Sequence, residues 1–568
     1  MDFQELVELY EQLENTASGN QMREILSGFF KKVPAKEVRI VAYLTLGQIS
    51  SGFTAINLGL ADKLVLKAIA RSSGKELPPI MKIMHQTGDV GLTAEETLHK
   101  KPRTLVPVEK LTITDLFENL QQIAQASGAG SQDLKCNLLI SLLQRASAKG
   151  AKYITRIVLG TLRMGVGEMT VLDSLALAYT GEKKNKAVLE TAYNICPDVG
   201  IIAETIVKKG LSGLEKMEIH LGRPIKMMLA QRVEALEDIP RKISGPLAVE
   251  GKYDGERVQA HKSKEGIVLF SRRLENITEQ FPDLVDYFKK QITAKEFVLE
   301  AEIIAIDEQG KHQPFQLLMQ RRRKHHVQEY VKKIPIQAKL FDLLYLDGKS
   351  LLQESYEQRY KLLKKIVIQS KHIALSDRLV NIELPQLKAF FEKMLQEGYE
   401  GVMIKSLSGE YQAGTRGWNW IKWKKEYVKD LGDTFDLVVV GAYHGKGRRS
   451  GLYGALLCAV YDQKEDAFKT ICKLGTGLTD EVLAGLPEQL KKYKVDKKPV
   501  RVQVKKEMEP DLWFEPAIVV EVLAAEVTKS PFHTLGYALR FPRFIRIRED
   551  KTAEQTTTSK EIIDLIRS

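Results

Sequence analysis

Cysteine is scarce in this sequence of 568 residues. The four cysteines are Cys136, Cys196, Cys458 and Cys472, and no two of them form a C-x-x-C pair. Paired cysteines of that kind build zinc modules and thioredoxin-like redox motifs, so neither class of site is visible in the sequence. We expect the four residues to be buried or incidental thiols in a reducing compartment.

Long apolar runs are also missing. No stretch approaches the roughly 20 apolar residues that a helix needs to cross a bilayer. The N-terminus lacks the charged-then-apolar pattern of a secretory signal. We therefore expect no membrane association and a cytoplasmic location.

The charge balance is basic. Lys and Arg number 85 against 73 Asp and Glu, a formal net charge of +12. This excess favours a polyanionic partner, although a soluble protein that is merely basic fits the number equally well. The hydrophobic fraction of 44% is ordinary for a globular chain, and the length predicts two to four domains rather than one core.

Three patterns of predicted secondary structure follow one another along the chain. Up to about residue 215 apolar residues recur three and four apart, the helical period, as in residues 3–13, 38–49 and 134–143. Glycine and serine clusters separate these helices. Strand-like runs alternate with helices from about residue 223, as at 297–306 and 336–346, which predicts an α+β region. After about residue 430, short runs at 435–443, 455–461, 500–505 and 517–523 predict a small β-barrel.

One short segment groups residues that carry chemistry. Lys252 follows the apolar run 246–249 and precedes Asp254, Gly255 and Arg257. A lysine acts as a covalent nucleophile when its amine is neutral, and an ordinary lysine has a pKa of about 10.4. Arg257 could supply the neighbouring cation that favours the neutral amine, and Asp254 could hold a metal or orient it. A solvated turn after a strand is the alternative for this spacing.

The pattern Lys-x-Asp-Gly-x-Arg resembles the nucleophile motif of covalent nucleotidyltransferases, which comprise DNA ligases, RNA ligases and mRNA capping enzymes. Segments similar to the remaining motifs of this superfamily follow in order at residues 271–276, 299–304, 340–345, 400–405, 420–425 and 540–551. The last of them is similar to the C-terminal motif of ATP-dependent DNA ligases. The chain is therefore identified as similar to the ATP-dependent DNA ligases of the archaeal and eukaryotic replicative type.

The resemblance implies a role for each motif residue. Lys252 carries AMP, Phe341 stacks on adenine, and Glu302 holds the ribose. The nucleotide contacts that it implies are Glu250, Arg257, Arg272, Glu302, Phe341, Arg416, Lys422 and Lys424. Asp254, Glu302 and Glu400 are the implied ligands of Mg²⁺. Arg540 and Lys551 would orient the pyrophosphate of ATP and so require closure of the C-terminal domain.

Strand alternation agrees with two of these motifs. It places Glu300 and Glu302 on one face of a strand, opposite Leu299, Ala301 and Ile303, as a metal and ribose site against a core requires. It also places Lys422 beside Lys424, with Ile421 and Trp423 buried behind them. A solvated basic strand edge is the alternative for the lysines, and Phe341 taken alone would be a core aromatic.

The family also implies a domain layout. An all-α DNA-binding domain is expected at residues 1–215, an α+β adenylation domain at 216–429, and a β-barrel OB-fold at 430–568. Glycines in segments 87–92 and 160–165 would allow close approach to DNA phosphates, although simple helix punctuation also explains them. The absence of a tetracysteine module excludes an NAD-dependent ligase, and no long segment precedes the helices, which favours the archaeal layout.

Three further segments resemble sites that we do not expect here. Residues 441–446 fall one short of P-loop spacing, and residues 445–449 fit a basic barrel loop facing DNA better. His325 and His326 lie in a basic stretch that predicts an exposed loop rather than a metal site. Residues 21–30 faintly resemble a peptide that binds a sliding clamp, but a helix burying Leu26, Phe29 and Phe30 is favoured.

The expected function is sealing of nicks in duplex DNA, with ATP and Mg²⁺, in replication, recombination and repair. The family implies nicked DNA and a sliding clamp as partners, and we expect a monomer. Two alternatives remain open at this point. One is an RNA ligase, and the other is a non-catalytic DNA-binding scaffold, which would have no use for Lys252 or Glu302.

Overall fold

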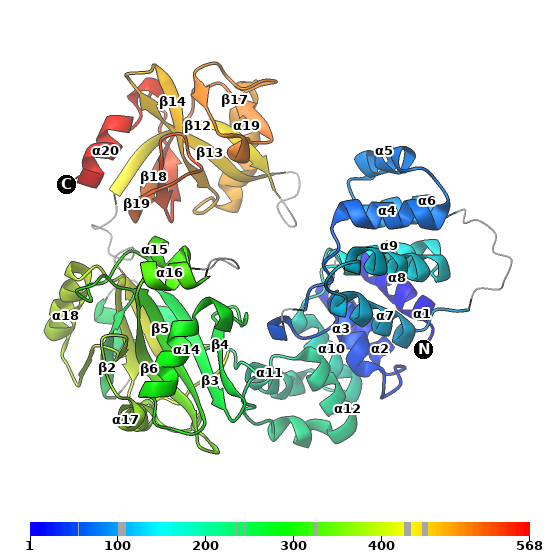
Figure 1. The fold of residues 1–568 in the computed structure, drawn as a ribbon. Coiled ribbons are helices and arrows are strands. Elements are labelled where there is room, and N and C mark those ends of the chain that lie inside the picture. Colours follow the sequence, from blue (N-terminus) through cyan, green and yellow to red (C-terminus); the bar gives the residue numbers. More distant parts are fainter. Residues whose placement is uncertain are drawn as a thin grey trace. The chain divides into compact units, whose positions relative to one another are not determined.

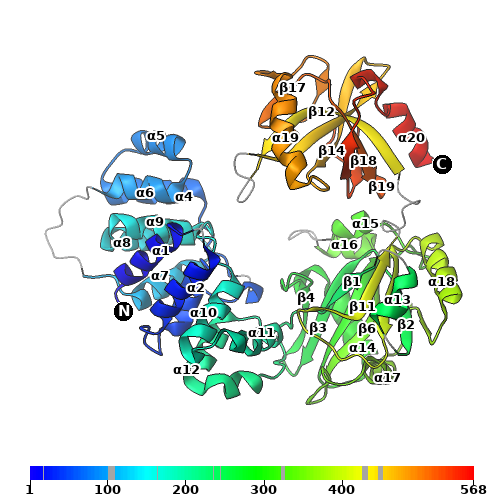
Figure 2. The same cartoon turned by 180° about the vertical axis from the view of Figure 1, so that it is seen from behind.

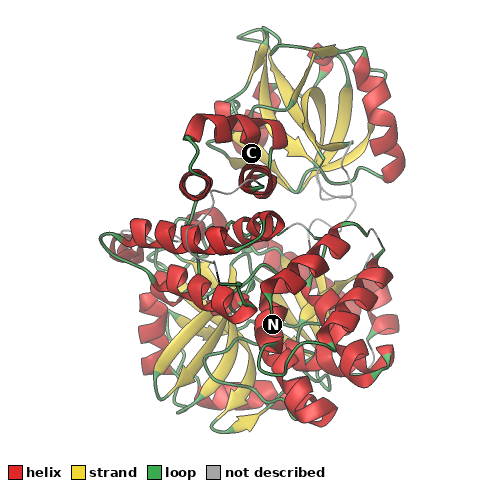
Figure 3. Ribbon diagram, turned by 90° about the vertical axis from the view of Figure 1, so that its right-hand side faces the viewer, coloured by secondary structure: helices red, strands yellow, loops and turns green. Residues whose placement is uncertain are grey.

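The computed structural model describes residues 1–16, 18–54, 56–99, 109–162, 164–233, 236–243, 245–321, 327–424, 433–445 and 452–567. The chain divides into two compact units. The first comprises Met1–Gln231, Lys242–Glu383 and Met403–Ile421, and the second comprises Arg232–Arg241, Leu384–Val402 and Lys422–Ser568. Figure 1 labels the elements, and Figure 3 distinguishes the all-helical part from the strand-rich parts.

The N-terminal part of the first unit is helical, as predicted. Its helices are α1 (Phe3–Glu14), α2 (Gly19–Phe30), α3 (Val38–Thr45), α4 (Asp62–Ser73), α5 (Leu77–Thr87), α6 (Val90–Leu98), α7 (Ile113–Gln125), α8 (Ser131–Arg145), α9 (Ala148–Val158), α10 (Glu168–Thr180), α11 (Lys186–Ile195) and α12 (Val199–Glu215). The last helix ends at the residue where the predicted helical domain ends.

Local chemistry explains where these helices start and stop. Asp2 accepts a hydrogen bond from the amide of Gln4 and completes a capping box at the start of α1. The helix predicted over 38–49 ends early, because Gly47 takes a left-handed conformation with φ of 67°. Helix α2 buries Leu26 and Phe30 completely, which confirms the helical interpretation of residues 21–30.

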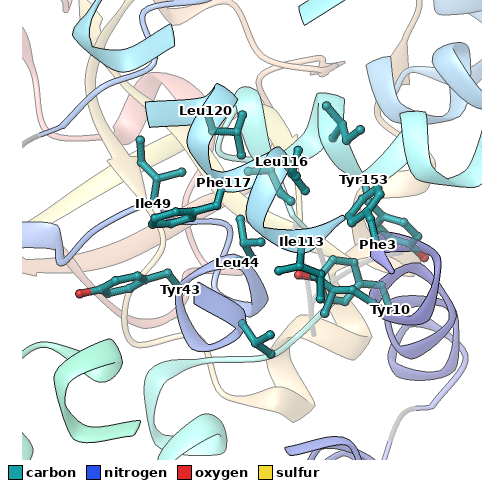
Figure 4. Packing of buried hydrophobic residues seen from close by; sticks show 14 of the residues in the cluster. Phe3, Tyr10, Tyr43, Leu44, Ile49, Ile113, Leu116, Phe117, Leu120 and Tyr153 are labelled. Carbon is teal, nitrogen blue, oxygen red and sulfur yellow. The ribbon is translucent and has the colours of Figure 1, made fainter. Parts of the chain in front are cut away.

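One apolar core joins these helices. Figure 4 shows side chains from α1, α3, α7 and α9 converging, among them Phe3, Tyr10, Phe117 and Tyr153. The rings of Tyr10 and Tyr153 meet edge to face, with their centroids 5.1 Å apart. This packing makes α9 a central, almost wholly buried helix.

Two sheets follow the helices. The first has the order β1 (Leu229–Arg232), β11 (Arg416–Lys424), β10 (Gly401–Ser406), β2 (Leu247–Lys252) and β9 (Arg378–Val380). The second has the order β4 (Gly266–Ser271), β3 (Glu256–Ser263), β5 (Phe297–Ala305), β6 (Ile336–Leu346) and β7 (Lys349–Ser350), and β8 (Ile373–Leu375) pairs with β6. Figure 2 shows β1, β2 and β11 from behind.

Several helices connect these strands along the chain. They are α13 (Ile239–Lys242), α14 (Pro282–Gln291), α15 (Phe315–Met319), α16 (Val327–Lys333), α17 (Tyr356–Ile366) and α18 (Leu384–Gln396). Leu299, Ala301 and Ile303 of β5 enter one core together with Phe288 of α14. Val298, on the opposite face of β5, enters a second core with Phe341 and Trp420. The predicted alternation along β5 is therefore confirmed, with both faces buried.

The C-terminal part of the second unit is rich in strands. One sheet contains β12 (Asp433–His444), β13 (Tyr453–Asp462), β14 (Ala467–Leu474), β15 (Lys494–Val495), β16 (Val502–Gln503), β17 (Leu512–Phe514), β18 (Val519–Ala524) and β21 (Arg543–Ile547). Strands β19 (Glu526–Lys529) and β20 (Tyr537–Arg540) pair separately, and α19 (Asp480–Lys491) and α20 (Ser559–Arg567) complete the part.

One predicted strand is shorter than expected. The strand predicted over 500–505 shrinks to Val502–Gln503, because a turn at Pro499 and a 3₁₀ turn from Lys506 bound it. The predicted boundary at 429/430 lies outside the described residues.

All four cysteines are buried free thiols. Among the described helices, none is long and apolar enough to cross a bilayer.

Candidate active site

The nucleophile candidate lies at the end of a strand. Lys252 is the last residue of β2, and Tyr253, Asp254 and Gly255 turn the chain into β3. A Cβ on Gly255 would lie 2.2 Å from the carbonyl oxygen of Ile303 and 3.0 Å from Cγ of Glu302. Only glycine therefore fits, and its absent side chain lets the turn press against β5 beside Glu302.

Tyr253 anchors this turn from inside. Its hydroxyl donates to Asp377 Oδ2 at 2.9 Å and accepts from the Asp377 amide at 2.7 Å. Lys339 Nζ reaches the same carboxylate oxygen at 2.9 Å. Burial, followed by the Asp377 charge, raises the pKa of Tyr253 well above its ordinary value, so the hydroxyl stays protonated. The motif gave no signal for Asp377 or Lys339.

Arg257 is held in a buried ion pair. Its Nη2 lies 2.8 Å from Glu300 Oε2, and its Nη1 donates to the carbonyl of Met228 at 2.8 Å. Burial opposes the guanidinium charge, but Glu300 and Tyr411 raise the pKa of Arg257 above its ordinary value. The cation that we expected to act on Lys252 is thus already paired with a carboxylate.

This pair also divides the predicted acidic face of β5. Glu300 is fully buried and accepts a second hydrogen bond, from the Tyr411 hydroxyl at 3.0 Å. Glu302 is only half-buried. Glu300 therefore does not face an open site, because it is buried and paired with Arg257, and the role of Glu302 stays a prediction.

Glu250 and Phe341 lie inside the first unit. Glu250 is 2% exposed, and its carboxylate accepts from Tyr356, Ser376 and Lys405. Phe341 meets Trp420 edge to face, with ring centroids 6.1 Å apart. The Arg257 guanidinium lies 5.4 Å from the centroid of the Phe341 ring. Phe341 is therefore part of a packed aromatic cluster as well as a predicted base contact.

A second buried ion pair supports the strand that carries Phe341. Asp342 and Arg359 are both fully buried, and Arg359 Nε lies 2.7 Å from Asp342 Oδ1. Arg359 also donates to the carbonyls of Glu354 and Gly409, at 2.6 and 3.2 Å. These groups satisfy the guanidinium, so α17 is held to β6. Sequence reasoning missed Arg359 because it lies in an otherwise ordinary amphipathic helix.

Lys422, Lys424 and Glu400 belong to the second unit. Lys424 Nζ lies 2.8 Å from Glu400 Oε2. Trp423 is 5% exposed and Ile421 fully buried, whereas Lys422 and Lys424 are half-buried. This confirms the predicted alternation along β11.

The predicted arginine contacts occupy exposed ends of strands. Arg272 follows β4 directly, and its side chain is exposed. Arg416 begins β11, is also exposed, and its carbonyl accepts from Gln231 Nε2 at 2.9 Å. Both side chains are free of dense packing, as a ligand contact requires.

The C-terminal candidates have acidic partners. Arg540 Nη1 lies 2.7 Å from Glu526 Oε1 across the β19–β20 pair. Lys551 Nζ lies 2.6 Å from Asp436 Oδ2. Arg548, which we did not single out, reaches the same carboxylate at 3.0 Å. Any anion that Arg540 or Lys551 binds must compete with these carboxylates.

The donor chemistry fits a divalent cation that is shared with a phosphate. Among the described residues, no group of three or more His, Cys, Asp or Glu side chains is placed to hold a metal. Asp254 and Glu302 are half-buried carboxylates on either side of the close contact at Gly255. Mg²⁺ commonly binds through one or two carboxylates plus substrate phosphates, so these two residues suit it.

The glycines of the predicted DNA contacts have structural roles. Gly88 caps α5 in the left-handed conformation, and Gly160 has a φ of 65° just after α9. A Cβ on Gly91 would lie 2.7 Å from Nε of Arg156. Helix punctuation is thus confirmed for Gly88 and Gly160, and the DNA contact stays a prediction.

One of the segments that we set aside begins within a strand. Gly441 lies within β12, where a Cβ would meet Pro510 at 2.4 Å, so residues 441–446 do not begin a phosphate-binding loop. Residues 446–449 and both His325 and His326 lie outside the described part of the chain.

Comparison with known proteins identifies the family. Residues 2–176 match the DNA ligase N terminus, residues 227–424 the ATP dependent DNA ligase domain, and residues 449–551 the ATP dependent DNA ligase C terminal region. DNA ligase 2 of Thermofilum pendens is 45% identical over 99% of this chain and 97% of its own length. DNA ligase 1 of Methanosarcina mazei is 43% identical over 100% of this chain and 99% of its own.

A solved structure shares the fold. The structure titled Pmar-Lig_Pre. has a TM-score of 0.58 at 19% identity and covers 96% of this chain and 99% of its own. At that identity the similarity shows the fold alone. The full-length relatives and the three matching regions carry the assignment, and they place this chain in the ATP-dependent DNA ligase family.

Proposed function

We propose that this chain seals nicks between a 5′-phosphate and a 3′-hydroxyl in duplex DNA, using ATP and carrying AMP on Lys252. The observation that carries the proposal is the turn after β2, in which Gly255, three residues after Lys252, packs directly against Glu302 and Ile303 of β5. Family membership supports ATP as the nucleotide, and relatives named DNA ligase along the whole chain support DNA as the substrate.

The reaction has three steps. The Lys252 amine attacks the α-phosphate of ATP, a P–N bond forms, and the bond to pyrophosphate breaks. An oxygen of the 5′-phosphate at a nick then attacks the phosphorus of the bound AMP, a P–O–P bond forms, and the P–N bond to Lys252 breaks. Finally the 3′-hydroxyl attacks the activated phosphate, the phosphodiester forms and AMP leaves.

Each motif residue receives a role in the first step. Glu250 and Phe341 bind the base, Glu302 binds the ribose, and Arg257, Arg272 and Arg416 are further nucleotide contacts. Lys422 and Lys424 stabilise charge on the α-phosphate. Arg540 and Lys551 orient the pyrophosphate when the C-terminal domain closes.

Mg²⁺ would neutralise charge on the phosphates when bound, with Asp254 and Glu302 of the first unit as its ligands. Glu400, the third ligand that the family implies, belongs to the second unit. The half-burial of Asp254 and Glu302 suits a cation that also contacts the substrate.

The remaining assignments follow the family layout. We propose a DNA-binding domain at residues 1–215, an adenylation domain at 216–429 and an OB-fold domain at 430–568. Backbone phosphates would dominate the DNA affinity, which makes it sequence-tolerant and salt-dependent. Action in replication, recombination and repair as a cytoplasmic monomer, with a sliding clamp as partner, completes the proposal.

Incubation with ATP labelled on the α-phosphate tests the central step. The intact chain should form an acid-labile, base-stable protein–AMP adduct, and Lys252→Ala should form none. Lys264→Ala, an exposed lysine in the β3–β4 turn, is the matched control and should label normally. Labelling of Lys252→Ala, or none of the intact chain, would overturn the proposal.

The acceptor needs a separate test. Nicked DNA and nicked RNA duplexes of equal sequence and equal 5′-phosphorylation should be sealed with a clear preference for DNA. Preferential sealing of RNA would favour the RNA-ligase alternative.

A further inference from the structure

Lys405 is a buried lysine to which the motif assigns no role. It lies on β10, its side chain is 2% exposed, and three aromatic rings surround its Nζ. Nζ is 4.6 Å from the ring centroid of Phe341, and equally far from those of Tyr356 and Trp420. A cation enclosed in this way requires a fixed counter-charge, because burial of an unpaired charge is costly.

The counter-charge is Glu250. Lys405 Nζ donates to Glu250 Oε2 at 2.9 Å and to the Tyr356 hydroxyl at 3.3 Å. Ser376 donates to Glu250 Oε2 at 3.1 Å, and Tyr356 donates to Oε1. Burial, followed by the Glu250 charge, raises the pKa of Tyr356 well above its usual value, so the tyrosine remains a donor.

Counting acceptor positions shows what remains for a ligand. A carboxylate offers about four lone-pair sites, and three donors occupy Glu250 here. About one position is left, and its direction is set because the other three are held. The Tyr356 hydroxyl also points at the carbonyl of Phe341 at 3.1 Å, so the same cluster locates the ring expected to stack on the base.

An acceptor with one fixed direction discriminates between purines. Adenine carries an amino donor at the position where guanine carries a carbonyl acceptor. A free carboxylate could rotate toward the N–H groups on another edge of guanine, but a carboxylate held at three positions cannot. We propose that Lys405 is a positioning residue that, by holding Glu250, makes the site select adenine over guanine. The inference rests on the proposed function, since it assumes that Glu250 and Phe341 receive the base.

The test compares nucleotides in the full-length chain. Self-labelling rates are measured with ATP and with GTP, each labelled on the α-phosphate, at several concentrations. Lys405→Met keeps the length and apolar character of the side chain but removes its donor. We expect the ATP-to-GTP ratio of rate over half-saturating concentration to fall about tenfold or more, the usual effect of losing a hydrogen bond to a charged group. Lys405→Arg should restore much of the ratio.

A second buried cation provides the matched control. Arg321 is 1% exposed, and its Nη1 lies 3.0 Å from Asp283 Oδ2, without any contact to Glu250 among the described residues. Arg321→Met should lower the melting temperature but leave the ATP-to-GTP ratio unchanged. A merely structural role of Lys405 would give this same result, so an unchanged ratio in Lys405→Met overturns the inference.

A milder variant covers the case in which Lys405→Met does not fold. Ser376→Ala removes one donor to Glu250 and should lower the ratio in the same direction by a few-fold. If Ser376→Ala keeps the wild-type ratio, the inference fails. Failure of the proposed function looks different, because the unmodified chain would then form no adduct with ATP.

Discussion

At Gly255, the absence of a side chain determines how closely the turn after β2 approaches β5. Its Cα faces the carbonyl of Ile303 so closely that a Cβ would lie 2.2 Å from the oxygen. The turn carrying Lys252 can approach β5 only because that Cβ is absent. The glycine of the nucleophile motif is therefore explained by packing of the turn against the strand, without any direct chemical role.

Gly255→Ala should accordingly impair self-adenylation while leaving most of the fold intact. The added methyl group displaces the turn by about 1 Å, and misplacement of that size costs about 100-fold in rate. Gel quantification of the AMP adduct over time measures the effect. Gly167→Ala is the control, because a Cβ there meets nothing within 4 Å. Equal rates for Gly255→Ala and the unmodified chain would contradict this account.

Among the elements, α9 forms buried ion pairs with two other segments of the helical part. Arg156 on α9 pairs with Glu14 of α1, and its Nε reaches Asp89 Oδ1 at 3.1 Å. Asp89 caps α6 by accepting from the Leu92 amide at 2.8 Å. The carbonyl of Arg156 accepts from the Thr161 amide at 2.8 Å. One residue thus connects both segments predicted to contact DNA.

Arg156→Met should therefore weaken DNA binding more than it affects chemistry. Loss of a buried ion-pair partner costs about 3 kcal/mol in the free energy of unfolding, and the start of α6 loses its anchor. We expect the dissociation constant for nicked DNA, measured by fluorescence anisotropy, to rise about tenfold, a change equivalent to ~1.4 kcal/mol.

Self-adenylation needs no DNA and should stay normal in Arg156→Met. The control is Arg39→Met, which removes a mostly exposed pair with Glu204 at 3.4 Å. A normal dissociation constant for Arg156→Met, despite a lowered melting temperature, would show that the anchor is irrelevant to DNA.

At the scale of the whole molecule, the proposed mechanism requires the C-terminal domain to act differently in the first step and in the later steps. Arg540 and Lys551 are held by Glu526 and Asp436, and the proposal uses them only when pyrophosphate leaves. Their contribution should be electrostatic, since both would act on a developing negative charge.

A combined Arg540→Ala and Lys551→Ala variant separates the steps. Self-adenylation should slow by roughly 100-fold, as expected when a preorganised charge at a reacting phosphate is lost. Sealing of nicks that already carry AMP on the 5′-phosphate should continue at close to the normal rate. Arg501→Ala, which breaks surface pairs with Asp466 and Glu554, is the control. Equal losses in both assays would argue against a role confined to the first step.

The order of elements and the identity of the motif residues could be read from the sequence because both are local. A 3.6-residue period marked α1 and α8, and a two-residue period marked β5 and the alternation of Lys422 and Lys424 along β11. Motif spacing likewise named Lys252 without knowledge of its surroundings. Such patterns involve only a few neighbouring residues, so they can be recognised without knowledge of tertiary contacts.

The partners of those residues could not be read in the same way. Glu300 was expected to line the site, but it forms a buried ion pair with Arg257, which is forty-three residues away in the sequence. Lys405 reaches Glu250 across 155 positions, and Tyr253 reaches Asp377 across 124. Pairings at such separations depend on how the strands assemble into sheets. Lys252 was therefore predictable as the nucleophile candidate, whereas the groups that hold Glu250 and the turn at Lys252 became known only once the chain had folded around them.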